Sequence, residues 1–251
     1  MKAAAGPGSV YMAGGIDVVN RMKSGFPVSD VIHLGRVAGL DGIEGVEEGL
    51  RLGALVTHDR MATSPLVQAR LPALAQTWPD VANIRIRCKG TIGGNIMAGD
   101  PAYDFALAAL AADARLHFFT AEGSIQISSA VQAVGVTGDR LLIAITLPCG
   151  SALKWVFDRS LRPIVTVVLG LDVADGRVTG GRVALGGAYA PPLAASLPFP
   201  EPLPLGELAH HAEWIAQEVV TGLPTPLADH HATPAYRRRM IEVLLRRNLS
   251  A

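Results

Sequence analysis

The stretch Thr91-Ile92-Gly93-Gly94-Asn95 follows the basic and apolar run Ile84-Arg85-Ile86-Arg87, and a second glycine pair lies far upstream in Ala13-Gly14-Gly15-Ile16-Asp17. Because glycine accepts positive φ at little steric cost, a Gly-Gly step lets successive backbone N–H groups point into one concavity, where an anion can bind. The two segments therefore predict two tight turns that hold one pyrophosphate from two sides.

A plain turn is the alternative for each glycine pair, since the chain has 27 glycines and short glycine motifs are weakly specific. Neither segment matches the phosphate loop G-x-x-x-x-G-K-[ST] or the dinucleotide fingerprint G-x-G-x-x-G. The second segment is more distinctive, because it continues without a break to Asp104, nine residues after Asn95.

The composition limits the classes of function. A chain of 251 residues, 49% of them hydrophobic, can bury a substantial core in one or two domains. We expect two, with a boundary around residue 149. Since 22 basic residues balance 22 acidic ones, no overall charge favours nucleic acid or an anionic membrane surface.

Cys88 and Cys149 are the only cysteines. Two thiols cannot supply the four thiolates of an iron–sulfur cluster, and they are too few for a disulfide-rich secreted scaffold. The first ten residues lack the apolar region of a signal peptide, and no run approaches 18 apolar residues. These features predict a soluble, cytoplasmic chain with two reduced thiols.

The hydrophobic patterns predict a mixed α+β chain. Expected strands in the first part cover residues 9–13, 31–34, 50–55, 115–119, 124–127 and 141–147. Helices are expected over 16–25, 57–63 with Thr57 as N-cap, most of 65–83, and 101–112. After Pro148 we expect β-rich runs over 153–157, 164–173 and 178–185, an extended crossing over 193–205, and helices near 205–220 and 234–249.

In this order, the segments resemble the flavin-binding subunit of the molybdenum hydroxylases, the family of xanthine dehydrogenase and aerobic carbon monoxide dehydrogenase. Ala13–Asp17 is similar to the family's A-G-G-T-D, and Ile86–Asn95 to I-R-N-x-G-T-I-G-G-N. Further similar stretches are Asp104, Gly138–Leu142 with Leu147-Pro148, Leu185–Ala188 (L-G-G) and Tyr236-Arg237-Arg238 (Y-R-R).

The resemblance implies a two-lobed FAD-binding domain of the molybdopterin dehydrogenase type over residues 1–148. A smaller α+β flavoprotein domain would follow over 149–251. FAD would lie extended between the lobes, with its pyrophosphate on the two glycine segments, a sugar-like hydroxyl on Asp104, and Leu142 beside the flavin. The implied cofactor-binding residues are Ala13, Gly14, Gly15, Ile16, Asp17, Val18, Thr91, Ile92, Gly94, Asn95, Ala98, Asp104 and Leu142.

The chain departs from the family pattern in four places. Only 12 residues precede Ala13, so we expect an abbreviated first lobe or one completed by a partner. Cys88 replaces the usual Asn, and Arg140 replaces an acidic residue. Asp158 or Arg159 falls where many members carry a lysine near the flavin, and an Asp would not favour an anionic reduced flavin.

The implied function is electron transfer, with no catalytic residue and no metal ligand in this chain. In the family, a large molybdenum subunit hydroxylates the substrate, and an iron–sulfur subunit carries two [2Fe–2S] clusters. The flavin subunit delivers electrons to the final acceptor, and the subunits form a dimer of heterotrimers. Two cysteines also argue against an extra [4Fe–4S] cluster here.

The sequence also fits other interpretations. The chain could be an assembly subunit that has lost FAD, or a stand-alone flavin reductase that turns over NAD(P)H. The pairs His210-His211 and His230-His231 favour a metal site only weakly, because adjacent helical residues point about 100° apart. The arginines of the last helix, Arg237–Arg239 and Arg246-Arg247, predict a solvated face or, less simply, a partner surface.

Overall fold

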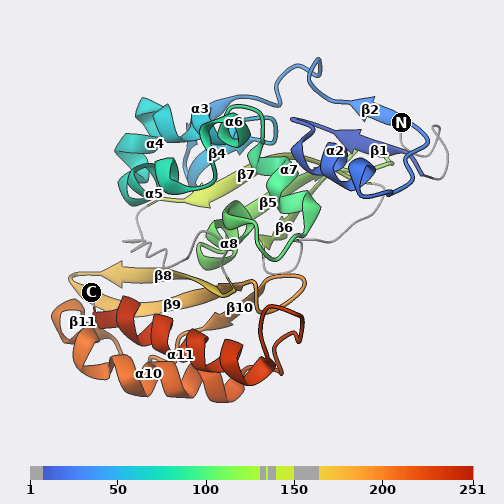
Figure 1. Ribbon diagram of the computed structural model, residues 1–251. Coiled ribbons are helices and arrows are strands. Elements are labelled where there is room, and N and C mark those ends of the chain that lie inside the picture. The colour runs from blue at the N-terminus through green and yellow to red at the C-terminus, as the bar shows by residue number, and fades with distance from the viewer. Residues whose placement is uncertain (1–7, 131–133, 135–139, 150–163, 251) are drawn as a thin grey trace. The chain divides into compact units, whose positions relative to one another are not determined.

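A computed structural model describes residues 8–130, 134, 140–149 and 164–250 of the chain (Figure 1). The chain divides into two compact units. The first comprises Met1–Ala98 and Ala114–Cys149, and the second comprises Gly99–Asp113 and Gly150–Ala251. The expected strand over 153–157, Asp158, Arg159 and Gly138-Asp139 lie outside the described residues.

The first unit begins with a small β-α-β arrangement of β1 (Val10–Met12), α2 (Ile16–Lys23) and β2 (Val31–His33). β1 and β2 are parallel, with Val10 opposite Val31, and parallel neighbours require a crossover such as α2. Gly25, with φ of 86°, follows the end of α2. The expected first strand and helix are both present.

A five-stranded antiparallel sheet forms the centre of the first unit, in the order β3-β4-β7-β5-β6. Its strands are β3 (Ile43–Val46), β4 (Gly49–Gly53), β5 (Arg115–Phe119), β6 (Ile125–Ser129) and β7 (Leu141–Pro148). Leu116 and Phe118 of β5 are buried, whereas Arg115 and Phe119 are exposed, so the sheet has one core face. The edge strand β3 was not expected from the sequence.

Short helices accompany this sheet: α3 (His58–Thr63), α4 (Pro65–Arg70), α5 (Pro72–Thr77), the 3₁₀ turn η1 (Trp78–Asp80), α6 (Ile84–Arg87) and α7 (Ile92–Ala98). The predicted N-cap of α3 is confirmed, because Thr57 Oγ1 accepts a hydrogen bond from the Arg60 amide at 3.2 Å. The largest fully buried side chains of these helices are Trp78, Met61, Leu74, Ile92 and Ile96.

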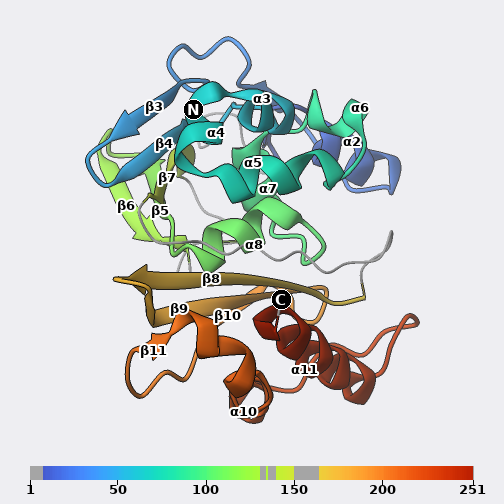
Figure 2. The same cartoon turned by 90° about the vertical axis from the view of Figure 1, so that its left-hand side faces the viewer.

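The second unit is a sheet with helices on both faces. Its strands are β8 (Thr166–Ala174), β9 (Arg177–Gly186), β10 (Leu193–Ser196) and β11 (Leu203–Pro204), and β9 pairs antiparallel with the other three. Figures 1 and 2 show α8 (Asp104–Ala111) on one face. The other face carries α10 (Leu208–Gly222) and α11 (Pro234–Ser250), with the 3₁₀ turn η2 (Leu205–Glu207) before α10.

Both faces of this sheet are therefore covered, and every residue of α8 is buried. Val167, Leu169 and Leu171 of β8 pack in one cluster with Ile215 of α10 and Leu245 of α11. None of the helices in the described ranges is both long and apolar enough to span a bilayer.

Candidate functional site

The first glycine segment forms the turn between β1 and α2. Gly15 is the N-cap of α2, with φ of 80° and ψ of −4°, and no side chain caps the helix there. The first N–H groups of a helix have no partner within it, and the helix dipole gives this end a partial positive charge. The segment thus has the backbone geometry of the predicted anion-binding turn.

Gly14 brings the two glycine segments together. A Cβ at this position would lie 1.7 Å from the carbonyl oxygen of Lys89 and 2.6 Å from its carbonyl carbon. Any side chain would therefore collide with main-chain atoms that cannot rotate away. Lys89 is two residues before Thr91, so the turn at Gly14 lies against the chain that leads into the second segment.

The second glycine segment is the first turn of α7, and the predicted tight turn is wrong at this position. The amides of Ile92 and Gly93 donate to the carbonyl oxygens of Val56 and Ala54, each at 3.0 Å. The amide of Gly94 donates to Thr91 Oγ1 at 3.1 Å, and that of Asn95 to Thr91 O at 3.0 Å. The N–H groups that a phosphate nest would offer are thus bonded within the chain.

Close packing explains why residue 93 is a glycine. A Cβ on Gly93 would lie 2.6 Å from the Ala54 Cβ and 2.7 Å from the Ala54 carbonyl oxygen. A Cβ on Gly94 would meet only Thr91 Oγ1, at 3.0 Å. Gly93 therefore permits α7 to approach the chain after β4, whereas Gly94 faces a single side-chain atom.

His58 supports the approach to the second segment, a role that the sequence did not reveal. Its side chain is 5% exposed, and its amide donates to the Gly90 carbonyl oxygen at 3.1 Å. The imidazole ring lies 5.7 Å from the Trp78 ring, centroid to centroid. Burial, helped by the charge of Arg87, lowers the pKa of His58 from 6.5 to about 4, so the ring is neutral at pH 7.

The other predicted cofactor residues occupy varied positions. Ala98 ends α7, and Leu142 is a buried residue of β7 that pairs with Phe118. Asp104 is the first residue of α8, is 6% exposed, and belongs to the second unit. Arg140 lies with its guanidinium 4.1 Å from the Phe118 ring centroid. Binding of FAD by these residues stays a prediction.

The histidine pairs do not assemble a metal centre in the described part of the chain. His210 and His211 are exposed residues of α10, and the ring centroids of His230 and His231 lie 3.8 Å apart with their planes tilted by 42°. Across the described ranges, no group of three or more His, Cys, Asp or Glu side chains is placed to hold a metal ion.

Comparison with known families decides the assignment. Residues 1–150 match the family described as "FAD binding domain in molybdopterin dehydrogenase". The chain belongs to this family. It is an FAD-binding medium subunit of the molybdopterin dehydrogenase type, a component of oxidoreductases, as the resemblance implied.

Similar proteins cover most of this medium subunit. It is 29% identical over 232 residues to the nicotine 6-hydroxylase medium subunit of Paenarthrobacter nicotinovorans. The matched region covers 88% of this chain and 81% of that protein. It is 24% identical over 246 residues to the glyceraldehyde dehydrogenase medium chain of Sulfolobus acidocaldarius, with 93% and 86% covered.

Solved structures confirm the α+β fold of this medium subunit. A chain of carbon monoxide dehydrogenase from Hydrogenophaga pseudoflava superposes with a TM-score of 0.82 at 22% identity, covering 98% of this chain and 89% of that one. A chain of quinoline 2-oxidoreductase from Pseudomonas putida 86 gives 0.80 at 22% identity, covering 98% and 90%. The expected fold is thus correct over nearly the full length.

The first glycine segment of this medium subunit fits the phosphates of FAD. It combines a left-handed Gly15, an uncapped helix end, and a Gly14 that leaves no space for a side chain. The amides of Ile92, Gly93, Gly94 and Asn95 do not add a second cradle, because each donates to an acceptor within the chain. The fit to FAD therefore rests on the turn before α2.

Proposed function

We propose that this medium subunit is the FAD-carrying electron-transfer subunit of a heteromeric molybdenum hydroxylase. It would pass electrons from the [2Fe–2S] clusters of a partner to an external acceptor. The turn at Gly14 and Gly15 carries the proposal, because its geometry suits a phosphate in a chain of an FAD-binding family. When bound, FAD supplies redox chemistry that no amino-acid side chain provides.

The chain's own groups would bind and orient the cofactor. Backbone amides at the start of α2 suit phosphate oxygens, and the carboxylate of Asp104 suits a hydroxyl donor of the sugar-like portion. Asp17 lies in the first turn of α2, where its carboxylate pairs with Arg21 at 3.8 Å. That pairing reduces the repulsion which a free carboxylate would exert on a phosphate.

The partners would be an iron–sulfur subunit and a large molybdenum subunit, in a dimer of heterotrimers. Relatives named as medium subunits or medium chains support an assembly of unlike chains. Two cysteines in the whole sequence, Cys88 and Cys149, fall short of the four that one cluster needs, so the clusters would belong to a partner. We place the assembly in the cytoplasm.

A visible absorption spectrum of the purified chain tests the proposal. We expect a yellow protein that releases FAD on heating, at about one FAD per chain, as identified by chromatography. Co-purification from the native host should also recover a cysteine-rich subunit and a large molybdenum subunit. A colourless chain that takes up no added FAD would refute FAD binding, and a lone monodisperse chain with full reductase activity would refute the assembly.

A non-catalytic assembly subunit is the second candidate. The bonded amides of Ile92, Gly93, Gly94 and Asn95 favour it, since they leave one phosphate turn where two were expected. This candidate predicts that the chain joins its partners normally without any flavin. FAD content and partner recovery, measured on the same sample, separate the two functions.

A further inference from the structure

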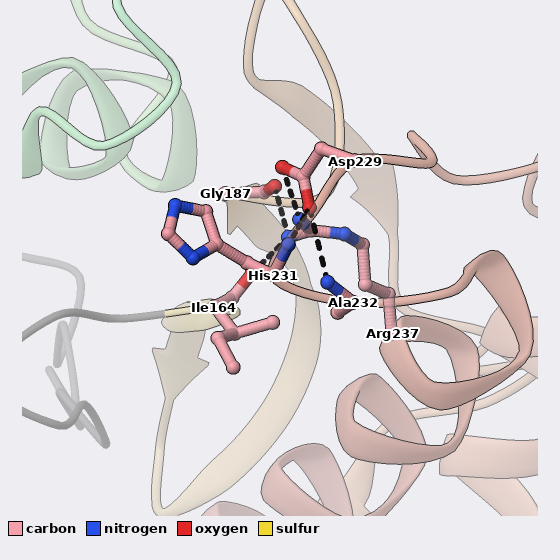
Figure 3. Close-up of polar contacts among 6 residues, drawn as sticks. All are labelled: Ile164, Gly187, Asp229, His231, Ala232 and Arg237. Atoms are coloured by element: carbon pink, nitrogen blue, oxygen red, sulfur yellow. Dashed lines mark hydrogen bonds and ion pairs between the residues drawn. The ribbon is translucent and has the colours of Figure 1, made fainter.

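Arg237 of α11 is a buried arginine, and it corrects the expectation of a solvated arginine face. Its side chain is 3% exposed. Figure 3 shows its guanidinium among three acceptors: Nη1 donates to the carbonyl oxygens of Ile164 and Gly187, the latter at 2.7 Å, and Nη2 donates to Asp229 Oδ2 at 2.6 Å. A charge buried in this way needs its partners, because removing them would leave it unpaired.

Asp229 is itself held in place by the chain that follows it. Its Oδ1 atom accepts from the amides of His231 and Ala232, at 2.9 and 3.0 Å (Figure 3). These amides, together with Arg237, lower the pKa of Asp229 to about 2. The carboxylate therefore stays ionised at neutral pH, where it can pair with the charge of Arg237.

Gly187 connects this ion pair to the segment before α8. It has φ of 72°, and its amide donates to the Pro101 carbonyl oxygen at 2.7 Å. The preceding Gly186 also packs closely against this segment. A Cβ on Gly186 would be 3.0 Å from the Pro101 carbonyl oxygen and 2.6 Å from Leu107 Cδ1. The segment Leu185–Ala188, which ends β9, is thus bonded to Arg237 and to Pro101, in both cases through Gly187.

Pro101 is three residues before Asp104, and the intervening chain is constrained. The amide of Ala102 donates to Asp100 Oδ1 at 2.8 Å, and the amide of Tyr103 donates to Asp100 O at 3.1 Å. Asp104 then begins the buried helix α8. The position of its carboxylate therefore depends on where Pro101 is held.

The neighbouring Arg238 provides a contrast within the same helix. Its guanidinium donates to the carbonyl oxygens of Val220, Leu223 and Pro224, at 2.6 to 3.2 Å. These acceptors lie at the end of α10 and just after it, and none of them belongs to the turn at Gly187. Arg238 thus ties two helices together, whereas Arg237 reaches the chain that leads to Asp104.

We propose that Arg237 is a positioning residue for FAD, which acts through Gly187 and Pro101 on the carboxylate of Asp104. This inference rests on the proposed function, because it needs Asp104 to contact the cofactor. It gives Gly187 of the L-G-G stretch and Arg237 of the Y-R-R stretch one shared role. Arg237 itself does not touch FAD in this proposal.

The test is a double-mutant cycle on the full-length chain. FAD affinity is measured by fluorescence titration for wild type, R237M, D104N and the double variant, with the melting temperature of each apo chain recorded alongside. We expect each single variant to weaken FAD binding about tenfold and the double variant no more than about twentyfold, since groups on one path are not additive. R238M, the matched control, should lower the melting temperature but change FAD affinity less than about twofold.

The lysine variant separates positioning from simple loss of stability. R237K keeps the charge near Asp229 but lacks the planar fork that reaches two carbonyls and a carboxylate together. We expect R237K to recover the melting temperature more fully than the FAD affinity. If R237M does not fold, the same cycle is run with R237K.

The outcomes are distinguishable. A wild-type chain that binds no FAD overturns the proposed function itself. If wild type binds FAD but D104N does not weaken it, Asp104 is not the target and the inference fails. A double variant weakened about a hundredfold, or an R238M variant weakened as much as R237M, would likewise overturn it.

Discussion

Gly15 and Gly93 each belong to a Gly-Gly pair of the first unit, yet their backbones serve different purposes. Gly15 has φ of 80° and caps α2 without any side-chain acceptor. Gly93 lies in the first turn of α7, where its amide bonds to Ala54 and its missing side chain lets two segments pack. Gly15 gives the turn before α2 its left-handed backbone, whereas Gly93 allows α7 to pack closely against Ala54.

The difference comes from what surrounds each pair. The carbonyl oxygens of Val56 and Ala54, and both oxygens of Thr91, are within reach of the second pair and take its donors. Within the described part of the chain, the amides of Gly14 and Gly15 have no such acceptor. A Gly-Gly step therefore indicates an anion site only when the protein leaves its N–H groups available.

The packing role of the second pair can be broken by one methyl group. We expect Gly93→Ala to lower the free energy of unfolding by about 3 kcal/mol, because its Cβ would overlap main-chain and side-chain atoms of Ala54. Gly94→Ala is the control and should change it by less than about 1 kcal/mol, since Ala also has the better helix propensity. Urea unfolding of both variants measures the difference, and equal losses would contradict the comparison.

His58 extends the comparison to pH, because it lies against Gly90 at the entry to the second segment. Its pKa is lowered from 6.5 to about 4 in the folded state, so the unfolded chain binds more protons between these values. The contribution of neutral His58 to the free energy of unfolding is therefore fully present above pH 6.5, and it is lost as the pH falls toward 4. We expect a loss of about 2 kcal/mol between pH 7 and pH 5.

Denaturant midpoints measured across this range check the His58 effect. His58→Gln should remove most of the pH dependence, whereas replacement of the exposed His211 by Gln should preserve it. If the His58→Gln variant still loses stability between pH 7 and pH 5, other groups take up the protons.

The ligand role of the first pair is tested by two glycines at opposite ends of α2. Gly15 and Gly25 have φ of 80° and 86°, so alanine at either position should cost about 1 kcal/mol of stability. Only Gly15→Ala should also weaken FAD binding, by about tenfold, because it alone changes the turn that we propose holds a phosphate of FAD. Parallel weakening by Gly25→Ala would mean that the loss reflects stability and not the site.

Regular elements with a strong pattern were predictable from the sequence. The strand over 115–119 and the helices over 57–63 and near 234–249 follow from alternation, an N-cap and length, and all are present. α7 was not predictable, because its start depends on carbonyls of Ala54 and Val56 that are distant in sequence from Gly93. A local pattern carries no information on such acceptors.

The site could be predicted in part. Gly14 and Gly15 were identified from their sequence, and the structure gives them the expected turn. The buried packing role of His58 was not predictable, because a buried neutral histidine leaves no local pattern. The burial of Arg237 was also missed, since a run of three arginines is typical of a solvated face, and only its acceptors at Ile164, Gly187 and Asp229 explain it.

The chain enters the second unit at Gly99, leaves it after Asp113, and returns after Cys149. The helix in that first visit, α8, is wholly buried, but the strands it covers begin only at Thr166. During synthesis, more than fifty further residues must therefore be added after α8 before the first strand of its partner sheet is made. A gene split after codon 149 would separate α8 from its sheet, so we expect the two fragments to recover a native second unit only when they are expressed together.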